Sequence, residues 1–128
     1  MGWGRPMSEW HQLSGAVLDC WVALAEGHVA PQVVGTGPHA VCQSMRLDYD
    51  YPLDFNPSAD WSLAEPILQR EHIRLRDMLL HQQPMFEAMM TYRGATWFAE
   101  GDLPLVAAMR VYVRTRFTDA QLAAPRFP

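Results

Sequence analysis

The chain of 128 residues contains no lysine, so all ten of its cationic residues are arginine. We interpret this absence as codon bias in a GC-rich genome, because a functional need for guanidinium groups would not remove lysine from every solvated position. Fourteen acidic residues outnumber the arginines, which gives a net charge of −4 and a pI near 5.6. This balance argues against a protein whose main task is to coat nucleic acid, since that affinity comes from clustered cations.

Cysteine and long apolar segments are also scarce. The two cysteines are Cys20 and Cys42. A chain of this length buries roughly two-thirds of its unfolded surface without disulfides, so we expect reduced, buried thiols. No apolar run reaches the roughly 18 residues of a membrane span, and residues 1–12 lack the pattern of a secretory signal. We therefore expect a cytoplasmic protein that makes no contact with membrane.

The composition is that of one folded domain. Hydrophobic residues make up 49% of the chain and charged residues 19%, which is too apolar for a disordered segment. We expect a flexible N-terminal tail over residues 1–12, a single α+β domain over residues 13–118, and a C-terminal tail over residues 119–128.

Residues 13–27 have the pattern of an amphipathic helix. Ser14 can cap its start and Gly27 can end it. Apolar side chains share one broad arc, namely Val17, Leu18, Trp21, Val22, Leu24 and Ala25. Asp19 and Glu26 fall on the opposite side, so we expect the helix to pack on the core and to turn these acids to solvent.

Residues 29–56 carry no helix signal and are punctuated by proline and glycine. We expect mostly loop here, with short extended pieces at residues 32–34 and 45–47. A short helix follows within residues 58–72 and ends near Arg70. Its start is signalled either by a capping box of Ser62 and Glu65 or by Pro66, which favours a first helical turn.

Residues 73–79 fit two structures. Their apolar positions would extend the helical stripe, and spacing alone slightly favours a long helix, whereas Ile73 and Leu75 alternate with two arginines as in a strand. Pro84 then breaks the chain, residues 85–91 can form a strand after a hairpin loop at residues 81–84, and Gly94 indicates a turn.

A last helix is predicted to start after Gly101, with Asp102 as its cap and Pro104 in its first turn, and to continue to about Phe117. One face carries Leu105, Val106, Met109, Tyr112, Val113 and Phe117, and its first three turns have little polar surface besides Arg110 and Arg114. Because Ala107, Ala108 and Val111 widen the apolar surface, we expect burial on more than one side, either in the domain or against a partner.

Three blocks of residues follow one another along the predicted domain. The first comprises Leu13, Ser14, Gly15, Leu18, Asp19, Ala25, Glu26 and Gly27. The second comprises Asp60, Trp61, Pro66, Ile67, Leu68, Arg70, Glu71 and Ile73. The third comprises Pro104, Leu105, Val106, Ala107, Ala108, Met109 and Arg110. Taken in this order, the three blocks resemble the NinX-like phage family.

The resemblance implies a small phage or prophage protein in which the segment after His72 is a hairpin. Ala64 and Glu65 depart from the family's pattern, which has glycines before the proline, and residues 29–57 show no pattern that can be aligned. The resemblance carries over no activity and no catalytic residue. With it, the expected fold is a small α+β domain with two long helices and a short one packed on a small antiparallel hairpin or sheet.

The sequence predicts no metal, no cofactor and no catalytic residue. The spacing of Cys20, His28, His39 and Cys42 fits no compact zinc pattern. The acidic stretch with Asp48, Asp50 and Asp54 has Pro52 where a calcium loop needs a glycine. No nucleophile elbow, metalloprotease helix or reactive-cysteine motif occurs, so we regard an enzyme as the less favoured alternative.

We expect a non-catalytic accessory protein that binds an unknown protein partner. The candidate contact residues are Trp61, Arg70, Glu71, Arg110, Val111 and Arg114. The alternative is a nucleic-acid module, in which Arg74 and Arg76 on one strand face and Arg110 and Arg114 on the last helix would grip phosphates if they lie side by side. Pairing of these arginines with nearby acids is the simpler explanation, and the net charge disfavours the alternative.

Overall fold

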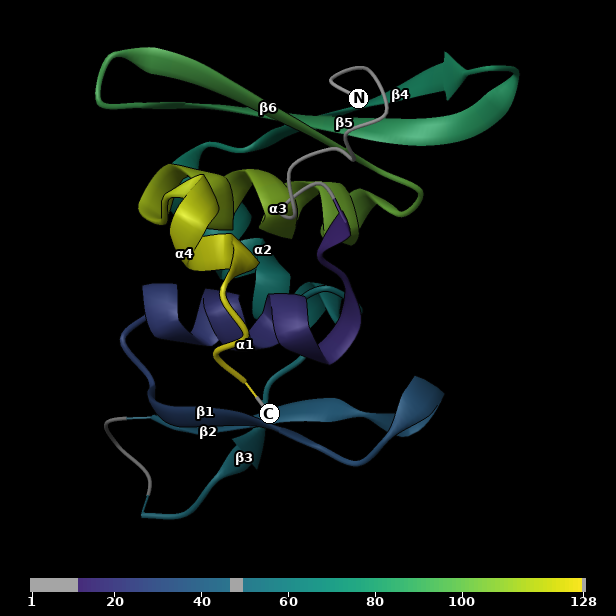
Figure 1. Ribbon diagram of the computed structural model, residues 1–128. Helices are drawn as coiled ribbons and strands as arrows, with labels where there is room; N and C mark the ends of the chain where they lie inside the picture. The colour runs from purple at the N-terminus through teal and green to yellow at the C-terminus, as the bar shows by residue number, and fades with distance from the viewer. Residues whose placement is uncertain (1–11, 47–49, 128) are drawn as a thin grey trace.

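A computed structural model describes residues 12–46 and 50–127, and it has four stacked layers (Figure 1). Two helices form the middle and a three-stranded antiparallel sheet covers each side. The helices are α1 (Gly15–Ala25), α2 (Trp61–Glu71), α3 (Pro104–Arg116) and α4 (Asp119–Ala123). Sheet A contains β1 (Val29–Val34), β2 (Val41–Met45) and β3 (Leu53–Asp54), and sheet B contains β4 (Arg74–Leu80), β5 (Gln83–Tyr92) and β6 (Ala95–Gly101).

The helix α1 lies between sheet A and α3, so it is buried on more sides than its sequence predicts. Ser14 occupies the N-cap position without a side-chain hydrogen bond. Gly27, at φ +82°, ends the helix, and the amide of His28 donates to the carbonyl of Ala23 at 2.9 Å, as in a Schellman motif. The expectation that Asp19 faces solvent is wrong, because this side chain is only 3% exposed.

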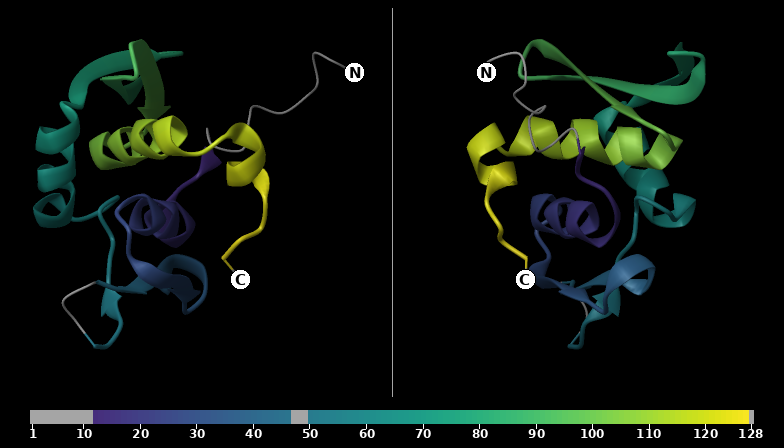
Figure 2. Two further views of the ribbon diagram at one scale, coloured as in Figure 1. Left: turned by 90° about the vertical axis from the view of Figure 1, so that its left-hand side faces the viewer. Right: turned by 45° about the vertical axis from the view of Figure 1, so that its right-hand side comes forward.

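The helix α2 stands beside α1 and α3 (Figure 2, left). Asp60, rather than Ser62, is its N-cap, and its carboxylate accepts a hydrogen bond from the Ser62 amide at 2.9 Å. Pro66 therefore lies inside the helix and not in its first turn. The helix ends at Glu71, one residue after the predicted end, because His72 adopts a left-handed conformation at φ +55°.

The helix α3 begins at Pro104, which lies in its first turn as predicted. The expected cap Asp102 is displaced by Leu103, which holds the N-cap position without a side-chain bond, since Pro104 takes the first helical position. The expected burial on more than one side is confirmed, because Ala107, Ala108 and Val111 are all fully buried. The helix packs against sheet B on one side and against α1 on the other.

Sheet A overturns the expectation of a loop over residues 29–56. Strand β1 pairs with β2 from Val34 opposite Val41 to Val29 opposite Met45, with a bulge between Val29 and Gln32. Ala30 has a φ of +52°, so the apolar alternation of a regular strand is broken there. Of the two extended pieces predicted, residues 32–34 lie in β1 and Met45 ends β2, whereas Leu47 lies outside the described residues.

Sheet B is a meander with two-residue turns. The hairpin implied for the segment after His72 is present, and its loop consists of His81 and Gln82 alone, both at positive φ. A second two-residue turn at Arg93 and Gly94 joins β5 to β6. Positive φ at both central residues is the geometry of type I′ turns, whose twist matches that of the paired strands.

The α+β class is confirmed, but its details differ from the prediction. In the described part of the chain α2 is as long as α1, and sheet A is an additional layer. Residues 119–128, predicted as a tail, begin with α4, where Leu122 is buried, and Phe127 stacks edge-on against Trp21 at 5.1 Å. Of the predicted N-terminal tail, residues 1–11 lie outside the described residues.

Candidate functional site

The outer face of sheet B is the side directed away from α3. Strand register places its side chains in rows, because residues directly opposite each other in antiparallel strands project to the same face. One row contains Arg74, Met89 and Phe98, the next contains Arg76, Glu87 and Glu100, and a third contains Met78 and Met85. We call these eight residues the outer face of sheet B.

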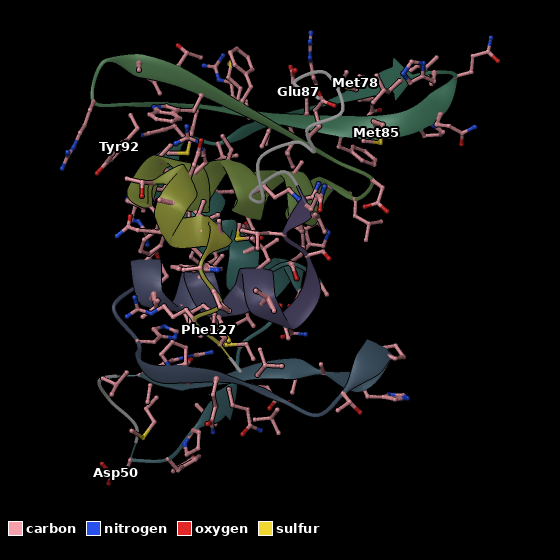
Figure 3. The ribbon with its side chains drawn as sticks, in the orientation of Figure 1. Asp50, Met78, Met85, Glu87, Tyr92 and Phe127 are labelled. Carbon is pink, nitrogen blue, oxygen red and sulfur yellow. The ribbon has the colours of Figure 1, made fainter. Side chains whose placement is uncertain are left out.

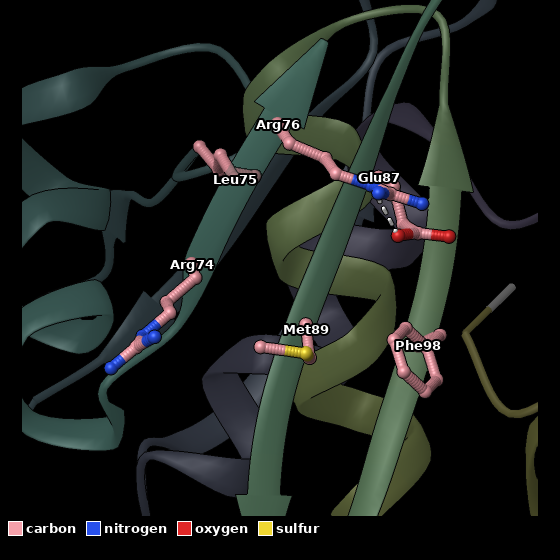
Figure 4. Close-up of a pocket in the computed structure, with 6 residues that line it drawn as sticks. All are labelled: Arg74, Leu75, Arg76, Glu87, Met89 and Phe98. Carbon is pink, nitrogen blue, oxygen red and sulfur yellow. Dashed lines mark ion pairs between the residues drawn. The ribbon is translucent and has the colours of Figure 1, made fainter. Parts of the chain in front are cut away.

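A shallow hollow lies on this face (Figure 4). Its volume is about 360 Å³, and it is lined by Arg74, Leu75, Arg76, Glu87, Met89 and Phe98. The Phe98 ring is 50% exposed, and Arg76 reaches over β5 to form an ion pair with Glu87 at 2.8 Å. An aromatic ring and a methionine thus stand beside two guanidinium groups on one surface.

The free end of the β4–β5 hairpin continues this surface beyond the end of β6 (Figures 1 and 3). A second hollow of about 300 Å³ lies at this end. Met78 and Met85 line it from the outer face, whereas its other lining residues belong to the alternate pairs that project to the other side of the hairpin, namely Asp77, Leu79, Pro84 and Phe86. Leu79 is 72% exposed. Methionine side chains are flexible and polarizable, and they are frequent on surfaces that adapt to a partner.

Arg70 and Glu71, predicted as contact residues, bind groups inside the domain. Arg70 donates to both carboxylate oxygens of Glu26, at 3.1 and 2.6 Å, and to Glu71 at 2.8 Å. Glu71 also accepts from Arg116 at 2.6 Å. Burial raises the pKa of Glu71, but the bonds from Arg70 and Arg116 outweigh it and hold that pKa below its usual value.

Tyr112 closes this polar network, donating to Glu26 at 2.5 Å. Burial raises its pKa, and the bond to Glu26 raises it further. The network joins α1, α2 and α3 at one point, so its physical task is to fix the angles between these helices.

Arg110 and Val111 are likewise occupied within the fold. Arg110 donates to the backbone carbonyls of Leu13 at 2.7 Å and Glu100 at 2.8 Å, which ties α1 and β6 to α3. Val111 is 0% exposed, so the apolar surplus that suggested a partner is covered by the domain itself. Arg114 pairs with Asp119 at 3.0 Å and lies 5.0 Å from the ring centre of Trp97.

Trp61 is a predicted contact residue that forms no polar bond within the described part of the chain, and it is 51% exposed, about as much as the Arg70 side chain. It lines a small hollow of about 150 Å³ with Leu103 and Pro104, between the first turns of α2 and α3. This hollow lies apart from the outer face of sheet B, with which it shares no lining residue.

The structure separates the two pairs of arginines that were predicted to grip phosphates. Arg74 and Arg76 project from the outer face of sheet B, whereas Arg110 and Arg114 belong to α3 on the other side of that sheet. Arg76, Arg110 and Arg114 already bind groups of the chain itself. These four residues therefore do not form one cationic surface.

Asp19 has the most displaced carboxyl pKa that the described residues show. Its two oxygens accept from the backbone amide and the hydroxyl of Ser58, both at 2.9 Å. Burial raises the pKa of Asp19 to about 7, against the lowering effect of those two bonds. The group links α1 to the segment that precedes α2.

Of the four histidine and cysteine candidates, His39 is exposed and the other three lie at least partly inside the domain. His28 shares a hydrogen bond with the buried Ser44 hydroxyl at 2.8 Å, and burial, reinforced by Arg46, lowers its pKa. Cys20 and Cys42 are both fully buried. In residues 12–46 and 50–127, no three His, Cys, Asp or Glu side chains are placed to hold a metal ion, and Asp48 lies outside the described residues.

Sequence reasoning missed the outer face of sheet B as a unit. Arg74 and Arg76 were recognised, but Met89 and Phe98 join them only through strand register. The signal that could have found them is the alternation of Glu87, Met89 and Thr91 with Ala88 and Met90, because it separates a surface row from a core row.

No helix in the described part of the chain has the length and apolar character needed to cross a membrane. A search of curated proteins gives no match. The family model for NinX of bacteriophage P22 matches residues 9–116, which include every helix and strand described above except α4. The chain therefore belongs to the bacteriophage P22 NinX family.

Proposed function

We propose that this phage-family protein is a cytoplasmic, non-catalytic accessory protein that binds another protein through the outer face of sheet B. One observation carries the proposal: Phe98, Met89, Met78 and Met85 lie on the same outer face of sheet B, which no other described element of the chain covers. Contiguous apolar surface of this kind, bordered by charged groups, is typical of protein interaction sites.

The non-catalytic part of the proposal is supported by where the reactive groups lie. Asp19 and Ser58 bind each other in the core, His28 is bound to Ser44, and Tyr112 is bound to Glu26. A general acid or base must reach a substrate. Neither hollow on sheet B contains a histidine or a cysteine.

A protein fits this surface better than a nucleic acid does. The outer face carries two arginines, Arg74 and Arg76, and two glutamates, Glu87 and Glu100, so its formal charge is zero. Binding to phosphate backbones depends on an excess of cationic groups. A neutral, methionine-containing face instead resembles the apolar centre and polar rim of a protein interface.

Site-specific photocrosslinking tests the proposal. Benzoylphenylalanine is placed at Phe98 on sheet B or at Gln32 on the outer side of sheet A, and cells carrying the phage are irradiated. We expect protein adducts from the Phe98 position and none above background from the Gln32 position. Adducts that nuclease removes, or equal protein labelling from both positions, would contradict the proposal.

A further inference from the structure

We infer that the outer face of sheet B binds a second copy of this chain, face to face. The inference rests on the proposed function, because it names the partner of the same surface. It follows from the way charge is distributed over the three strands, which makes this surface complementary to itself.

The charges of the outer face are segregated by strand. Both cationic side chains, Arg74 and Arg76, belong to the edge strand β4, whereas Glu87 lies on the central strand and Glu100 on the opposite edge strand. The whole chain has a net charge of −4, so most of its surface repels a second copy. The neutral outer face of sheet B allows close approach without that penalty.

A two-fold axis parallel to the strands makes opposite charges meet. Such an axis places β4 of one copy over β6 of the other, with the two β5 strands facing each other, as aligned sheets pack in sandwiches. Row by row, Arg76 then faces Glu100 of the second copy, and Arg74 faces Phe98 of the second copy. Each contact occurs twice, because a two-fold interface is reciprocal.

The other face-to-face arrangement is unfavourable. An axis across the strands places β4 over β4 of the second copy, so that the arginines of one copy meet those of the other. Like charges brought together at an interface cost several kcal/mol. Charge thus selects the arrangement in which β4 lies over β6.

The centre of the selected arrangement is apolar. Met89 lies on the central strand and meets Met89 of the second copy near the axis, flanked by the two Phe98 rings. Glu87 also lies near the axis, but Arg76 of its own chain pairs with it at 2.8 Å and neutralises it. The face therefore combines an apolar centre with paired charges at its border, as stable interfaces do.

The test uses two charge reversals that are each unfavourable alone and favourable together. In Arg76→Glu, two glutamates oppose each other across the axis, and in Glu100→Arg, two arginines do. We expect the full-length wild type to dimerise in sedimentation experiments, and each variant to weaken the dimer by about tenfold or more. Mixing the two variants restores attraction at both contacts, so we expect a heterodimer in native mass spectrometry, where the two subunits differ in mass.

Three outcomes overturn the inference: a wild type that stays monomeric into the millimolar range, a dimer unaffected by both reversals, or a mixture that gives no heterodimer. Gln32→Glu on sheet A is the matched control and should leave the dimer unchanged, while circular dichroism checks that each variant is folded. A monomer that still forms adducts with a different protein from position 98 overturns this inference and leaves the proposed function standing.

Discussion

Sheets A and B enclose the same pair of helices but present opposite characters to their surroundings. Each has three antiparallel strands, and each packs one face on a helix, sheet A on α1 and sheet B on α3. The outer side of sheet A has a polar row of Gln32, Gln43 and Asp54, in which the Gln43 amide donates to Asp54 at 2.9 Å. The outer face of sheet B has Met89 and Phe98 in the corresponding layer.

The difference shows that covering the core does not require an apolar outer face. Sheet A performs the same structural task with amides and a carboxylate directed outward, and it satisfies two of them with each other. The outward methionines and Phe98 of sheet B are therefore not needed for that structural task, and this is why we propose binding as their role.

The largest expected contrast is in the response to pH, because Asp19 on the sheet A side of the core is a buried carboxyl. Its folded-state pKa of about 7 exceeds the ordinary value of 3.8. The stability that this raised pKa contributes is present below pH 4 and is lost as pH rises through 7. The loss amounts to about 4 kcal/mol at most.

We expect Asp19→Asn to remove this dependence, since an amide does not ionise and can still bond to Ser58. Urea unfolding of both proteins between pH 4 and pH 8 measures it. The difference between wild type and variant isolates Asp19 from His28, whose lowered pKa acts in the opposite direction. If the free energies of unfolding of wild type and variant changed with pH in the same way, the pKa of Asp19 would not be raised in the folded state.

The second contrast concerns the inner faces of the two sheets. Met90 on sheet B and Cys42 on sheet A are both buried, at 2% and 0% exposure. Met90→Ala removes more atoms and leaves a larger cavity, so we expect a loss of about 3 kcal/mol. Cys42→Ala should cost roughly 1 kcal/mol. Chemical denaturation measures both losses of stability. Equal losses would mean that the residues around Met90 relax into the space that its side chain leaves.

The third contrast lies within sheet B. It compares Gly101, at the end of β6 next to α3, with Gly94, in the turn that joins β5 to β6. A Cβ at Gly101 would lie 2.8 Å from the backbone nitrogen of Ala107 in α3, and neither backbone can move cheaply. We expect Gly101→Ala to cost about 2 kcal/mol. Gly94→Ala meets no atom within 4 Å but has a φ of +78°, so roughly 1 kcal/mol is expected. The opposite order in thermal unfolding would contradict the close approach of α3 and β6.

The smallest contrast concerns one polar pair on each outer face, measured in dilute protein. Arg76→Ala breaks the ion pair with Glu87, and Gln43→Ala breaks the bond to Asp54. Each should cost less than about 1 kcal/mol. We expect only the Arg76 effect to shrink in concentrated salt, because salt screens charges and not neutral amides. Equal salt dependence would remove this distinction between the sheets.

The helices were predictable from local signals. Gly27 ends α1 and Pro104 lies in the first turn of α3 as the sequence indicates, because these two residues act through their own backbone conformations. The resemblance, rather than spacing, placed a hairpin after His72, and the left-handed conformation of that residue is what ends α2. The spacing of apolar residues alone favoured a long helix, because this spacing does not reveal that a residue other than glycine adopts a left-handed conformation and ends the helix.

Sheet A and the polar contacts were not predictable, because their partners are distant in sequence. Strand β1 is bulged at Ala30, which removes the alternation that identifies a strand. Asp19 was assigned to a solvated face because its partner Ser58 is 39 residues away. Arg70 was assigned to a binding surface for the same reason, since Glu26 lies 44 residues before it. In these cases the sequence showed which side chains can form polar bonds, but it did not show where in the fold each side chain would lie.

The contact between the first and the last long helix has a consequence for how the chain acquires its fold during synthesis. Trp21 packs on Phe117 at 4.9 Å, and Arg110 bonds to the carbonyl of Leu13, 97 residues earlier. The N-terminal half is made first, yet its largest buried ring has no cover until α3 has emerged. We therefore expect a nascent or truncated chain that ends before residue 104 to expose Trp21, and to be bound by chaperones or degraded by proteases rather than to fold as half of the domain.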